Sequence, residues 1–408
     1  MPSGELRIAL ISEKKNPPDK RVAFSPGQCL RIMEQYPKVR FLVEPSKVRC
    51  IPDADYTSAG ITLTNDPGSA DVLFGIKEVP AEELIPGKTY FFFSHTIKKQ
   101  AHNQKLLAAL LRNNITMVDY ECLQDDNGNR TVAFGRFAGI VGAYNGLRMW
   151  LRKKNLARLP SASECADMTD MLEQVRPCLP MLKHLKIVLT GTGRVGSGAM
   201  EVLKNLGIRQ LLPADYLAYQ GEEPVFSILS SCHYHEKNDG SGWDETEFRK
   251  NPSVFHSTFG HFAASTDLLI SCHFWNPAAP LLFTLNDIRK PEFRISVISD
   301  VTCDIGGSIP TTLRASSIES PFYDVNKADG RETEAFSGEN NISVCAVDNL
   351  PCELPLDASL AFGEMLMAHV LPELVTGNHK SVAGATICRE GRLCPAFNYL
   401  QDFAEGKG

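Results

Sequence analysis

The chain has 408 residues, of which 43% are hydrophobic and 22% charged, with 30 glycines and 25 prolines. This composition excludes collagen-like, coiled-coil and broadly disordered proteins, and the length predicts two domains at about 100–200 residues each. The formal net charge of -6 provides no basic field for phosphate backbones, so we expect no nucleic-acid partner.

The cysteines and the N-terminal residues predict a reducing compartment. The cysteines are scattered singly, without a C-x-x-C pair, which is unlike a disulfide scaffold. Residues Met1–Arg7 lack the basic start and apolar run of a secretory signal. No run of about 18 consecutive apolar residues suggests a membrane span. We therefore expect a cytoplasmic protein that does not cross a membrane.

The first 120 residues alternate strand-like runs with helical patterns, which is typical of βαβ units and a parallel sheet. A helix is expected from Ser25-Pro26, where a cap residue precedes a proline, and another over 99–111, where leucines recur at helical spacing. The expected strands are residues 6–11, 39–43, 72–76, 90–94 and 115–118.

A second α/β region follows a long helix that begins near residue 138. Strands are expected at 185–189, 268–272 and 295–299, and a final helix at 356–374. Residues 219–263 contain a polar, glycine-bearing run and are predicted to be a loop-rich insertion. The predicted fold class is α/β, with two Rossmann-like lobes, parallel sheets and a cleft between them.

The strongest local motif is the glycine-rich run 191–199, which follows the strand 185–189 and opens a helix. Gly191, Gly193 and Gly196 allow a tight turn, close backbone approach and helix–strand packing, so that the helix N-terminus faces a pyrophosphate. The run, which includes Val195, therefore predicts a dinucleotide site; a glycine-rich turn without a ligand is the alternative.

An acidic residue about 20 positions beyond such a motif holds the adenosine ribose hydroxyls. Asp215 stands at about this distance and favours NAD as the cofactor. Arg209 is close to it in sequence and could accommodate a ribose phosphate, so NADP stays possible.

Three strands of the first region are followed by ionisable residues. Lys77 and Glu78 follow one strand, His95 and Lys98 the next, and Glu121 the third. Each alone is typical of a solvated loop, but ligands of an open α/β sheet bind at these strand ends. A lysine whose pKa is lowered by burial and a histidine can move protons near neutrality, which suits chemistry at a carbon–nitrogen bond.

Two further groups of residues were considered for binding. Arg21 and Arg130 could bind carboxylates through their guanidinium groups. The run Cys232-His233-Tyr234-His235 resembles a metal-binding sequence, but no second ligand pair stands at a zinc spacing. We therefore expect no metal.

Seven blocks of sequence, in order along the chain, resemble the L-lysine-forming saccharopine dehydrogenases and the lysine-ketoglutarate reductase half of aminoadipic semialdehyde synthase. The family is related to alanine dehydrogenase. The blocks are Lys20–Pro26, Gly75–Pro80, Phe92–Lys98, Val118–Glu121, Phe134–Gly139, Ser299–Asp304 and Val347–Pro351.

The resemblance implies an oxidoreductase that joins L-lysine to 2-oxoglutarate and reduces the product to saccharopine, reversibly, with a nicotinamide cofactor. It implies that Lys77 and His95 are the catalytic acid–base pair. The implied substrate-binding residues are Arg21, Glu78, Lys98, Glu121, Arg130 and Phe134. The implied cofactor contacts beyond the glycine motif are Arg194, Asp215, Cys272, Asp300 and Asp348.

The resemblance also implies that the C-terminal tail returns to the first lobe. The expected domains are therefore 1–138 plus 348–408 for substrate, and 139–347 for the dinucleotide. Two alternatives stay open: an alanine dehydrogenase-like amino-acid dehydrogenase and a non-catalytic dinucleotide-binding regulator. The direction of the reaction in the cell and the oligomeric state do not follow from the sequence.

Overall fold

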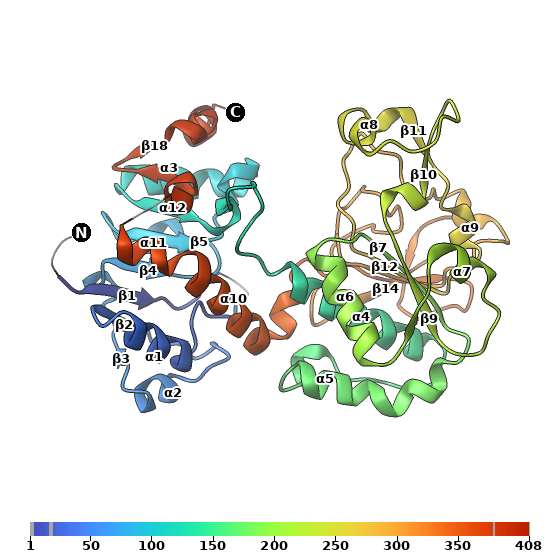
Figure 1. Cartoon of the computed structure of the whole chain (residues 1–408), viewed down its shortest axis with the longest axis horizontal. Coiled ribbons are helices and arrows are strands. Elements are labelled where there is room, and N and C mark those ends of the chain that lie inside the picture. The colour runs from blue at the N-terminus through green and yellow to red at the C-terminus, as the bar shows by residue number, and fades with distance from the viewer. Residues whose placement is uncertain (1–3, 16–18, 378–379, 408) are drawn as a thin grey trace. The chain divides into compact units, whose positions relative to one another are not determined.

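The computed structural model describes residues 4–15, 19–377 and 380–407. Met1–Ser3, part of the segment Met1–Arg7 from which the absence of a secretory signal was predicted, therefore lie outside the described residues. The chain divides into two compact units: unit 1 comprises Met1–Phe134 with Pro355–Gly408, and unit 2 comprises Gly135–Leu354. Figure 1 shows the red C-terminal elements in the same unit as the blue N-terminal strands. Residues 135–138 and 348–354, which the sequence assigned to the first domain, group with unit 2.

Within its described residues, unit 1 is built on an eight-stranded sheet of order β18-β17-β6-β5-β4-β1-β2-β3. The first six strands in the chain pair in parallel, whereas β17 pairs antiparallel with β6 and β18. The strands are β1 (Leu6–Leu10), β2 (Val39–Val43), β3 (Thr62–Leu63), β4 (Val72–Phe74), β5 (Thr89–Phe92), β6 (Thr116–Asp119), β17 (Thr386–Arg389) and β18 (Arg392–Leu393). The helices are α1 (Pro26–Gln35), α2 (Asp53–Ser58), α3 (Gln104–Arg112), α10 (Pro355–His369), α11 (Leu371–Thr376), α12 (Lys380–Gly384) and α13 (Gln401–Ala404).

Local sequence explains where the predicted elements of unit 1 begin. Ser25 and Gln28 form a capping box at the start of α1, and Pro26 occupies its first position. β4 is buried along its whole length, as expected for a strand of a parallel sheet that is covered on both faces. The short strands β3, β17 and β18 were not predicted, because two to four residues carry little periodicity.

Unit 2, all of whose residues are described, contains a second eight-stranded sheet of order β15-β14-β16-β13-β12-β7-β9-β8 and a two-stranded ribbon. The strands are β7 (Lys186–Thr190), β8 (Arg209–Gln210), β9 (Val225–Leu229), β10 (His235–Lys237), β11 (Phe255–Ser257), β12 (Leu268–Ser271), β13 (Val297–Asp300), β14 (Phe322–Val325), β15 (Glu332–Thr333) and β16 (Ile342–Cys345). The helices are α4 (Gly135–Lys153), α5 (Met168–Val175), α6 (Arg194–Asn205), α7 (Pro213–Ala218), α8 (Glu245–Lys250) and α9 (Gly260–Ala263).

The segment 219–263 is more regular than a loop-rich insertion. It contains β9, which pairs in parallel with β7 and so belongs to the central sheet. It also contains α8 and the antiparallel ribbon of β10 and β11. The prediction missed β9 because a five-residue apolar run beside a long polar stretch does not identify a strand by periodicity alone.

Glycines allow the helices α4 and α6 to approach closely. A Cβ atom added to Gly139 would lie 1.8 Å from the Val195 carbonyl oxygen, and one added to Gly198 would lie 1.9 Å from that of Arg136. Because no side chain fits there, the glycine motif is held against α4 through direct backbone packing. This contact fixes the start of α6, where the dinucleotide was predicted to bind.

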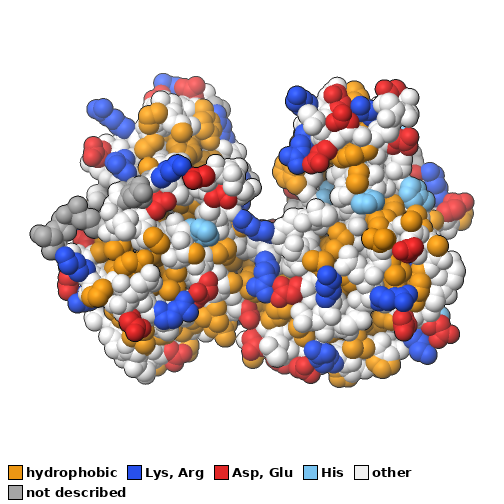
Figure 2. Space-filling model, in the orientation of Figure 1, with side chains coloured by type: hydrophobic (Ala, Val, Ile, Leu, Met, Phe, Trp, Pro, Cys, Tyr) orange, Lys and Arg blue, Asp and Glu red, His pale blue; other side chains and the backbone are white. Residues whose placement is uncertain are grey.

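The segment Pro355–Thr376, which spans α10 and α11, is long and apolar enough to cross a membrane by length and composition. One side of α10 packs into unit 1: the Phe362 ring lies 4.4 Å from the Phe134 ring and 5.0 Å from the Tyr120 ring. This packing is typical of a core helix. On the face drawn in Figure 2, acidic and basic side chains are interspersed over both units, without a broad field of one sign.

Candidate functional site

The carboxyl ends of four adjacent strands in unit 1 carry ionisable side chains. In the sheet order β6-β5-β4-β1, the residues that follow these strands include Glu121, His95, Lys77 and Glu13 respectively. Parallel strands bring their carboxyl ends to one edge of the sheet, so these groups gather there although they are far apart in sequence. This edge is the candidate site of unit 1.

His95 and Glu78 form a close pair at this edge. The Nδ1 atom of His95 lies 2.5 Å from a carboxylate oxygen of Glu78. His95 has a left-handed backbone conformation, with φ of 54°, which is uncommon for a residue with a side chain. Unfavourable backbone geometry of this kind concentrates at functional sites, where surrounding contacts hold it in place.

Glu78 is held as an anion by its neighbours. Burial by itself raises the pKa of this carboxyl, but the hydrogen bond and charge of His95 outweigh burial and bring the pKa to about 2. Lys15 also contributes an ion pair, with its Nζ atom 3.0 Å from the second carboxylate oxygen. Because Glu78 contacts Nδ1 of the imidazole directly, it is suited to positioning the His95 ring.

Glu13 was not singled out from the sequence, although it follows the first predicted strand. Its two carboxylate oxygens accept hydrogen bonds from the backbone N–H groups of Ile76 at 2.6 Å and Lys77 at 2.8 Å. Burial raises the pKa of Glu13 to about 8, and the nearby charge of Asp19 contributes to the increase. Glu13 therefore fixes the backbone that carries Lys77 and is itself able to exchange a proton near neutral pH.

The amine of Lys77 is the least committed cation at this edge. Among the described residues, its Nζ atom makes no hydrogen bond or ion pair, whereas Lys15, Lys98 and Arg130 are each ion-paired. Burial lowers the pKa of the amine, and the positive charges of Arg21 and Lys15 lower it further. A lowered pKa makes this amine a better proton donor and acceptor at physiological pH than an ordinary lysine, as a general acid–base requires.

Arg21 lies in a different environment from the one expected. It is 3% exposed, and its Nε and Nη2 atoms donate to the two carboxylate oxygens of Asp19 at 3.0 and 2.6 Å. The guanidinium carbon also stands 4.0 Å from the centre of the Phe134 ring. Arg21 and Phe134 are therefore together, but this fork of Arg21 is committed to Asp19 rather than open to a ligand.

Lys98, Glu121 and Arg130 form a second charged group at the edge. One carboxylate oxygen of Glu121 lies 3.2 Å from the Lys98 amine and 3.4 Å from the Arg130 guanidinium. The side chains of Lys98 and Arg130 are 46% and 36% exposed, so both cations are accessible to an anionic ligand. Three of the predicted substrate residues, Lys98, Glu121 and Arg130, are thus in contact at this edge of unit 1.

The glycine motif of unit 2 forms a tight turn between β7 and α6. Gly191 has φ of 90°, and an added Cβ would lie 2.7 Å from the Cys272 carbonyl oxygen. A Cβ on Gly196 would lie 2.0 Å from the Gly191 carbonyl oxygen, whereas one on Gly193 would meet no atom within 4 Å. Gly191 and Gly196 are therefore required by the packing of the protein itself. Gly193 instead leaves open space at the start of the helix.

A cavity of about 1360 Å³ lies over this turn, at the carboxyl ends of β7, β9, β12 and β13. The predicted residues that line it are Gly191, Gly193, Arg194, Val195 and Cys272. Gly196 supports the turn from within the first turn of α6. Asp300 is buried at the end of β13, where its carboxylate accepts hydrogen bonds from Thr302 at 2.6 Å and Thr312 at 2.5 Å.

Asp215, Asp300 and Asp348 are not among the residues that line this cavity. Asp215 lies exposed in the first turn of α7, because the strand beside β7 in the sheet is β9 rather than the segment before Asp215. The residues that follow β9 are Ser230, Ser231 and Cys232, and all three line the cavity. Asp348 is exposed after β16 and contributes its charge to the environment of Cys303.

The N-terminus of α6 and the open space beside it fit the diphosphate of a dinucleotide. No side chain caps the N-terminus of α6, and the first turn of the helix contains no acidic residue. Its backbone N–H groups and positive dipole end therefore face the open space beside Gly193, which is the environment that an anionic phosphate needs. In unit 2, the cavity lining thus supplies a place for this group of the cofactor.

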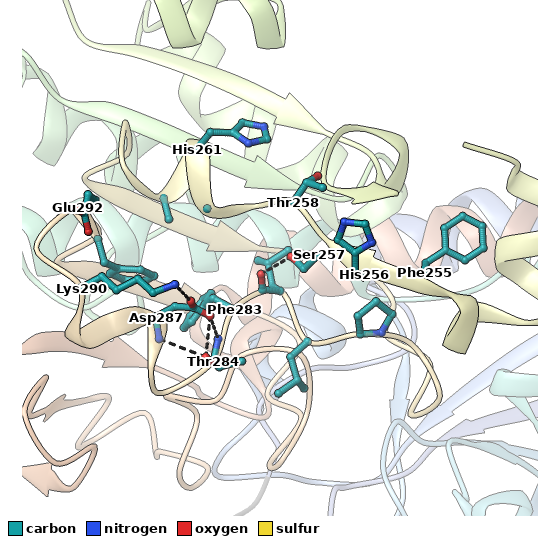
Figure 3. Close-up of a pocket in the computed structure, with 16 residues that line it drawn as sticks. Phe255, His256, Ser257, Thr258, His261, Phe283, Thr284, Asp287, Lys290 and Glu292 are labelled. Atoms are coloured by element: carbon teal, nitrogen blue, oxygen red, sulfur yellow. Dashed lines mark hydrogen bonds and ion pairs between the residues drawn. The ribbon is translucent and has the colours of Figure 1, made fainter. Parts of the chain in front are cut away.

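A second hollow, of about 640 Å³, lies elsewhere on unit 2 beside β11 and α9 and contains none of the predicted site residues. Figure 3 shows the charged groups Lys290 and Asp287 bonded to each other and Asp287 bonded to Thr284. The Lys290–Asp287 distance is 2.7 Å. Because these polar groups already hydrogen-bond one another, the hollow offers fewer free groups to a ligand than the cavity over the glycine turn does.

Comparison with known proteins agrees with the resemblance predicted from the sequence. Residues 9–141 match the model of the alanine dehydrogenase/PNT N-terminal domain. The chain is 32% identical to the mitochondrial alpha-aminoadipic semialdehyde synthase of Mus musculus, over 98% of the chain and 48% of that protein. It is 26% identical to a saccharopine dehydrogenase [NAD(+), L-lysine-forming] of Yarrowia lipolytica, over 90% of the chain and 92% of that protein.

The fold also matches that of a solved relative. An L-alanine dehydrogenase structure superimposes with a TM-score of 0.68 and 21% identity, and covers 98% of this chain and 100% of that chain. This match confirms the predicted α/β fold with two Rossmann-like lobes. The chain spans about half the length of the first curated relatives that it matches.

Proposed function

We propose that this chain, a homologue of the saccharopine dehydrogenases, interconverts saccharopine with L-lysine and 2-oxoglutarate using a nicotinamide dinucleotide. The observation that carries the proposal is the uncommitted amine of Lys77, with its lowered pKa, at the same sheet edge as the His95–Glu78 pair. Two proton-exchanging groups at one sheet edge suit the joining of an amine to a ketone, which requires several proton transfers. The cavity over the glycine turn supports the dinucleotide.

In this proposal, the ε-amine of lysine attacks the keto carbon of 2-oxoglutarate, and one water is released as the imine forms. Lys77 takes the proton that the amine must lose, and His95 protonates the departing oxygen. A reduced dinucleotide, held at the turn of Gly191, Gly193 and Arg194, would supply the hydride that reduces the imine carbon, and the nitrogen would keep a proton. The reverse reaction uses the same groups in the opposite protonation states.

Charge complementarity supports the substrate class. Saccharopine carries three carboxylates, and the half-exposed cations Lys98 and Arg130 lie at the same edge as Lys77. Arginine and lysine are the side chains that bind carboxylates by charge-assisted hydrogen bonds. Glu121 holds both cations in place in the absence of ligand, and a substrate carboxylate would compete with it.

The matched model for the alanine dehydrogenase N-terminal domain supports a second candidate, an amino-acid dehydrogenase that acts on a smaller 2-oxo acid. That reaction needs the same proton-exchanging groups but takes ammonia in place of the lysine amine. The Yarrowia lipolytica relative is an NAD(+) enzyme by name, which supports NAD as the cofactor here. Specificity for NAD over NADP belongs to the proposal.

The test follows NADH and NADPH oxidation by absorbance with the purified chain. Lysine and 2-oxoglutarate are added separately and then together, and pyruvate with ammonia is the matched comparison. Oxidation only when lysine and 2-oxoglutarate are both present is the expected result. Turnover with pyruvate and ammonia alone would favour the second candidate, and no turnover despite dinucleotide binding would favour a regulator.

The cytoplasmic location predicted from the N-terminal residues stays a prediction, since the mouse relative is mitochondrial by name. Fractionation of cells that express the chain with its native termini would decide the compartment. The predicted cleft between the two lobes also stays a prediction.

A further inference from the structure

Asp119, the last residue of β6, is a buried carboxylate that the proposed mechanism does not use. It is 0% exposed, and in the register of β5 and β6 it stands beside Phe92, close to the strand end that precedes His95. The groups that hydrogen-bond its side chain are backbone amides and a hydroxyl. Burying a carboxylate among uncharged groups costs stability, so a side chain of this kind needs a reason beyond packing.

The carboxylate of Asp119 links the loops that follow β5 and β6. Its Oδ2 atom accepts hydrogen bonds from the backbone N–H of Ser94 at 3.1 Å and from the Ser94 hydroxyl at 2.5 Å. Its Oδ1 atom accepts one from the backbone N–H of Glu121 at 2.8 Å. One buried side chain therefore holds the start of both loops, one of which carries His95.

The hydroxyl of Ser94 extends this hold to the other side of His95. Ser94 Oγ donates its single proton to Asp119, so it acts as an acceptor toward Thr96. Thr96 supplies two donors, with its Oγ1 atom 2.8 Å and its backbone nitrogen 3.2 Å from Ser94 Oγ. Ser94 and Thr96 are each 0% exposed. The residues on both sides of His95 are thus tied to one buried carboxylate.

The backbone of His95 needs such a hold. It has the left-handed conformation, with φ of 54° and ψ of 9°, which a residue with a side chain keeps only where surrounding contacts fix it. The hydrogen bonds of Ser94 and Thr96 are contacts of this kind. Because the backbone conformation sets the direction in which the ring leaves the chain, it also decides whether Nδ1 reaches Glu78 at 2.5 Å.

We propose that Asp119 is a positioning residue that, through Ser94 and Thr96, holds the His95 ring where it exchanges protons with the substrate. The inference rests on the proposed function, in which His95 protonates the departing oxygen. Because Asp119 is 0% exposed, it acts on the reaction only through these neighbours. A displacement of about 1 Å at a reacting group can cost about 10²-fold in rate, so a rigid link of this kind has a direct effect on turnover.

Steady-state kinetics of S94A, D119N and the S94A/D119N double variant tests the inference. S94A removes the hydroxyl that binds the carboxylate, and D119N leaves one acceptor oxygen in place of two. The matched control is S343A in unit 2, where the Ser343 hydroxyl donates to the carboxylate of Asp324 at 2.6 Å and both residues are 0% exposed. The control removes an equivalent buried serine–aspartate bond that does not belong to the sheet edge of unit 1.

We expect the kcat of S94A to fall about 10–100-fold, because His95 is misplaced. The KM for 2-oxoglutarate and the calorimetric Kd for NADH should stay within about twofold of the wild type. D119N should also lower kcat, and the double variant should be within about twofold of the slower single variant, since both changes break one linkage. S343A should lose melting temperature as S94A does, but keep its kcat.

Thr96 provides a second pair of variants, which decides the inference if S94A does not fold. T96V removes the hydroxyl at nearly constant shape and should lower kcat about threefold to tenfold, as loss of a hydrogen bond predicts. T96S keeps the hydroxyl and should retain kcat. NMR of chain labelled with ¹⁵N-histidine, with H95Q identifying the His95 signals, follows the ring without turnover. The Nδ1 signal should shift in S94A and T96V and stay in place in S343A.

The outcomes separate the inference from the proposed function. A wild type without turnover overturns the proposed function, and an Nδ1 signal that is unchanged in S94A and T96V then overturns the positioning role as well. An active wild type whose kcat is kept in S94A and T96V overturns the inference alone, since the linkage then serves folding only. Equal loss of kcat in S343A also overturns it, because that reports general destabilisation, and additive losses in the double variant overturn the role of Asp119.

Discussion

Both units present a candidate site at the carboxyl ends of parallel strands, but the groups gathered there differ in kind. In unit 1 the edge carries Glu13, Lys77 and Glu78, whose pKa values are shifted by burial and by nearby charges, and it carries His95 bonded to Glu78. In unit 2 the edge carries glycines, hydroxyls and His273, whose pKa burial lowers to about 4. The same sheet architecture thus gathers interacting charges in one unit and backbone and neutral groups in the other.

The largest expected effect separates chemistry from binding. Replacing the proposed proton carriers in a K77M/H95Q variant should reduce turnover by about 10²–10⁴-fold or more, because each general acid–base contributes on that scale. Affinity for NADH should be nearly unchanged, since both residues belong to unit 1. Steady-state kinetics measures the turnover and calorimetry measures the NADH affinity. The control is K105M, at an exposed lysine of α3. Unchanged turnover would refute the assigned roles.

A smaller effect, on dinucleotide binding rather than on proton transfer, is expected at the glycine turn. The variant G193A should fold as the wild type does, because an added Cβ meets no protein atom within 4 Å. Its methyl group would occupy space proposed for the diphosphate, so dinucleotide affinity should fall by about 10–100-fold, or about 1.4–2.8 kcal/mol. Titration with ADP-ribose checks this prediction, with G260A as the control. Full affinity in G193A would show that the ligand does not approach Gly193.

The pH dependence of stability tests the electrostatics of unit 1. The pKa of Glu13 rises from its ordinary 4.5 to about 8 in the folded chain, so the folded state binds the extra proton between these values. Stability contributed by this group is therefore present at low pH and is lost as pH rises through about 8. E13Q cannot ionise, but its amide nitrogen replaces one of the two acceptor oxygens, so a constant offset from the wild type is expected. On top of that offset, its melting temperature should rise relative to the wild type by a few degrees between about pH 4.5 and about pH 8.5.

Thermal unfolding of both proteins across that pH range gives the measurement. Glu5, exposed and near the same strand, provides the control variant E5Q, whose difference from wild type should not change with pH. A melting-temperature difference for E13Q that is constant with pH would contradict the raised pKa of Glu13.

The smallest effect is expected at Asp215. Because it is exposed on α7 and does not line the cavity, D215N should bind NADH within about twofold of the wild type, a change below about 0.4 kcal/mol. If Asp215 contacted the adenosine ribose, as the sequence predicts, D215N would instead lose NADH affinity clearly. Calorimetric titration distinguishes the two, and a loss of tenfold or more would favour the contact expected from the sequence.

The sequence alone predicted the α/β class, the glycine turn and the ionisable groups after three strands, because these depend on local patterns. Periodicity identifies long strands and helices, and turn chemistry places glycines. The rule that ionisable residues after parallel strands gather at one sheet edge also identifies Glu13, which follows the first strand. These features need only the residues near each position in the chain.

Tertiary structure alone decided which distant residues became neighbours. The sheet order sets β9 rather than the segment before Asp215 beside β7, so serines and not a carboxylate follow the neighbouring strand. It also packs the Arg21 guanidinium against the Phe134 ring, which is far away in the sequence. Strand order, burial and pairing depend on how the whole sheet packs, and local sequence patterns do not contain that information.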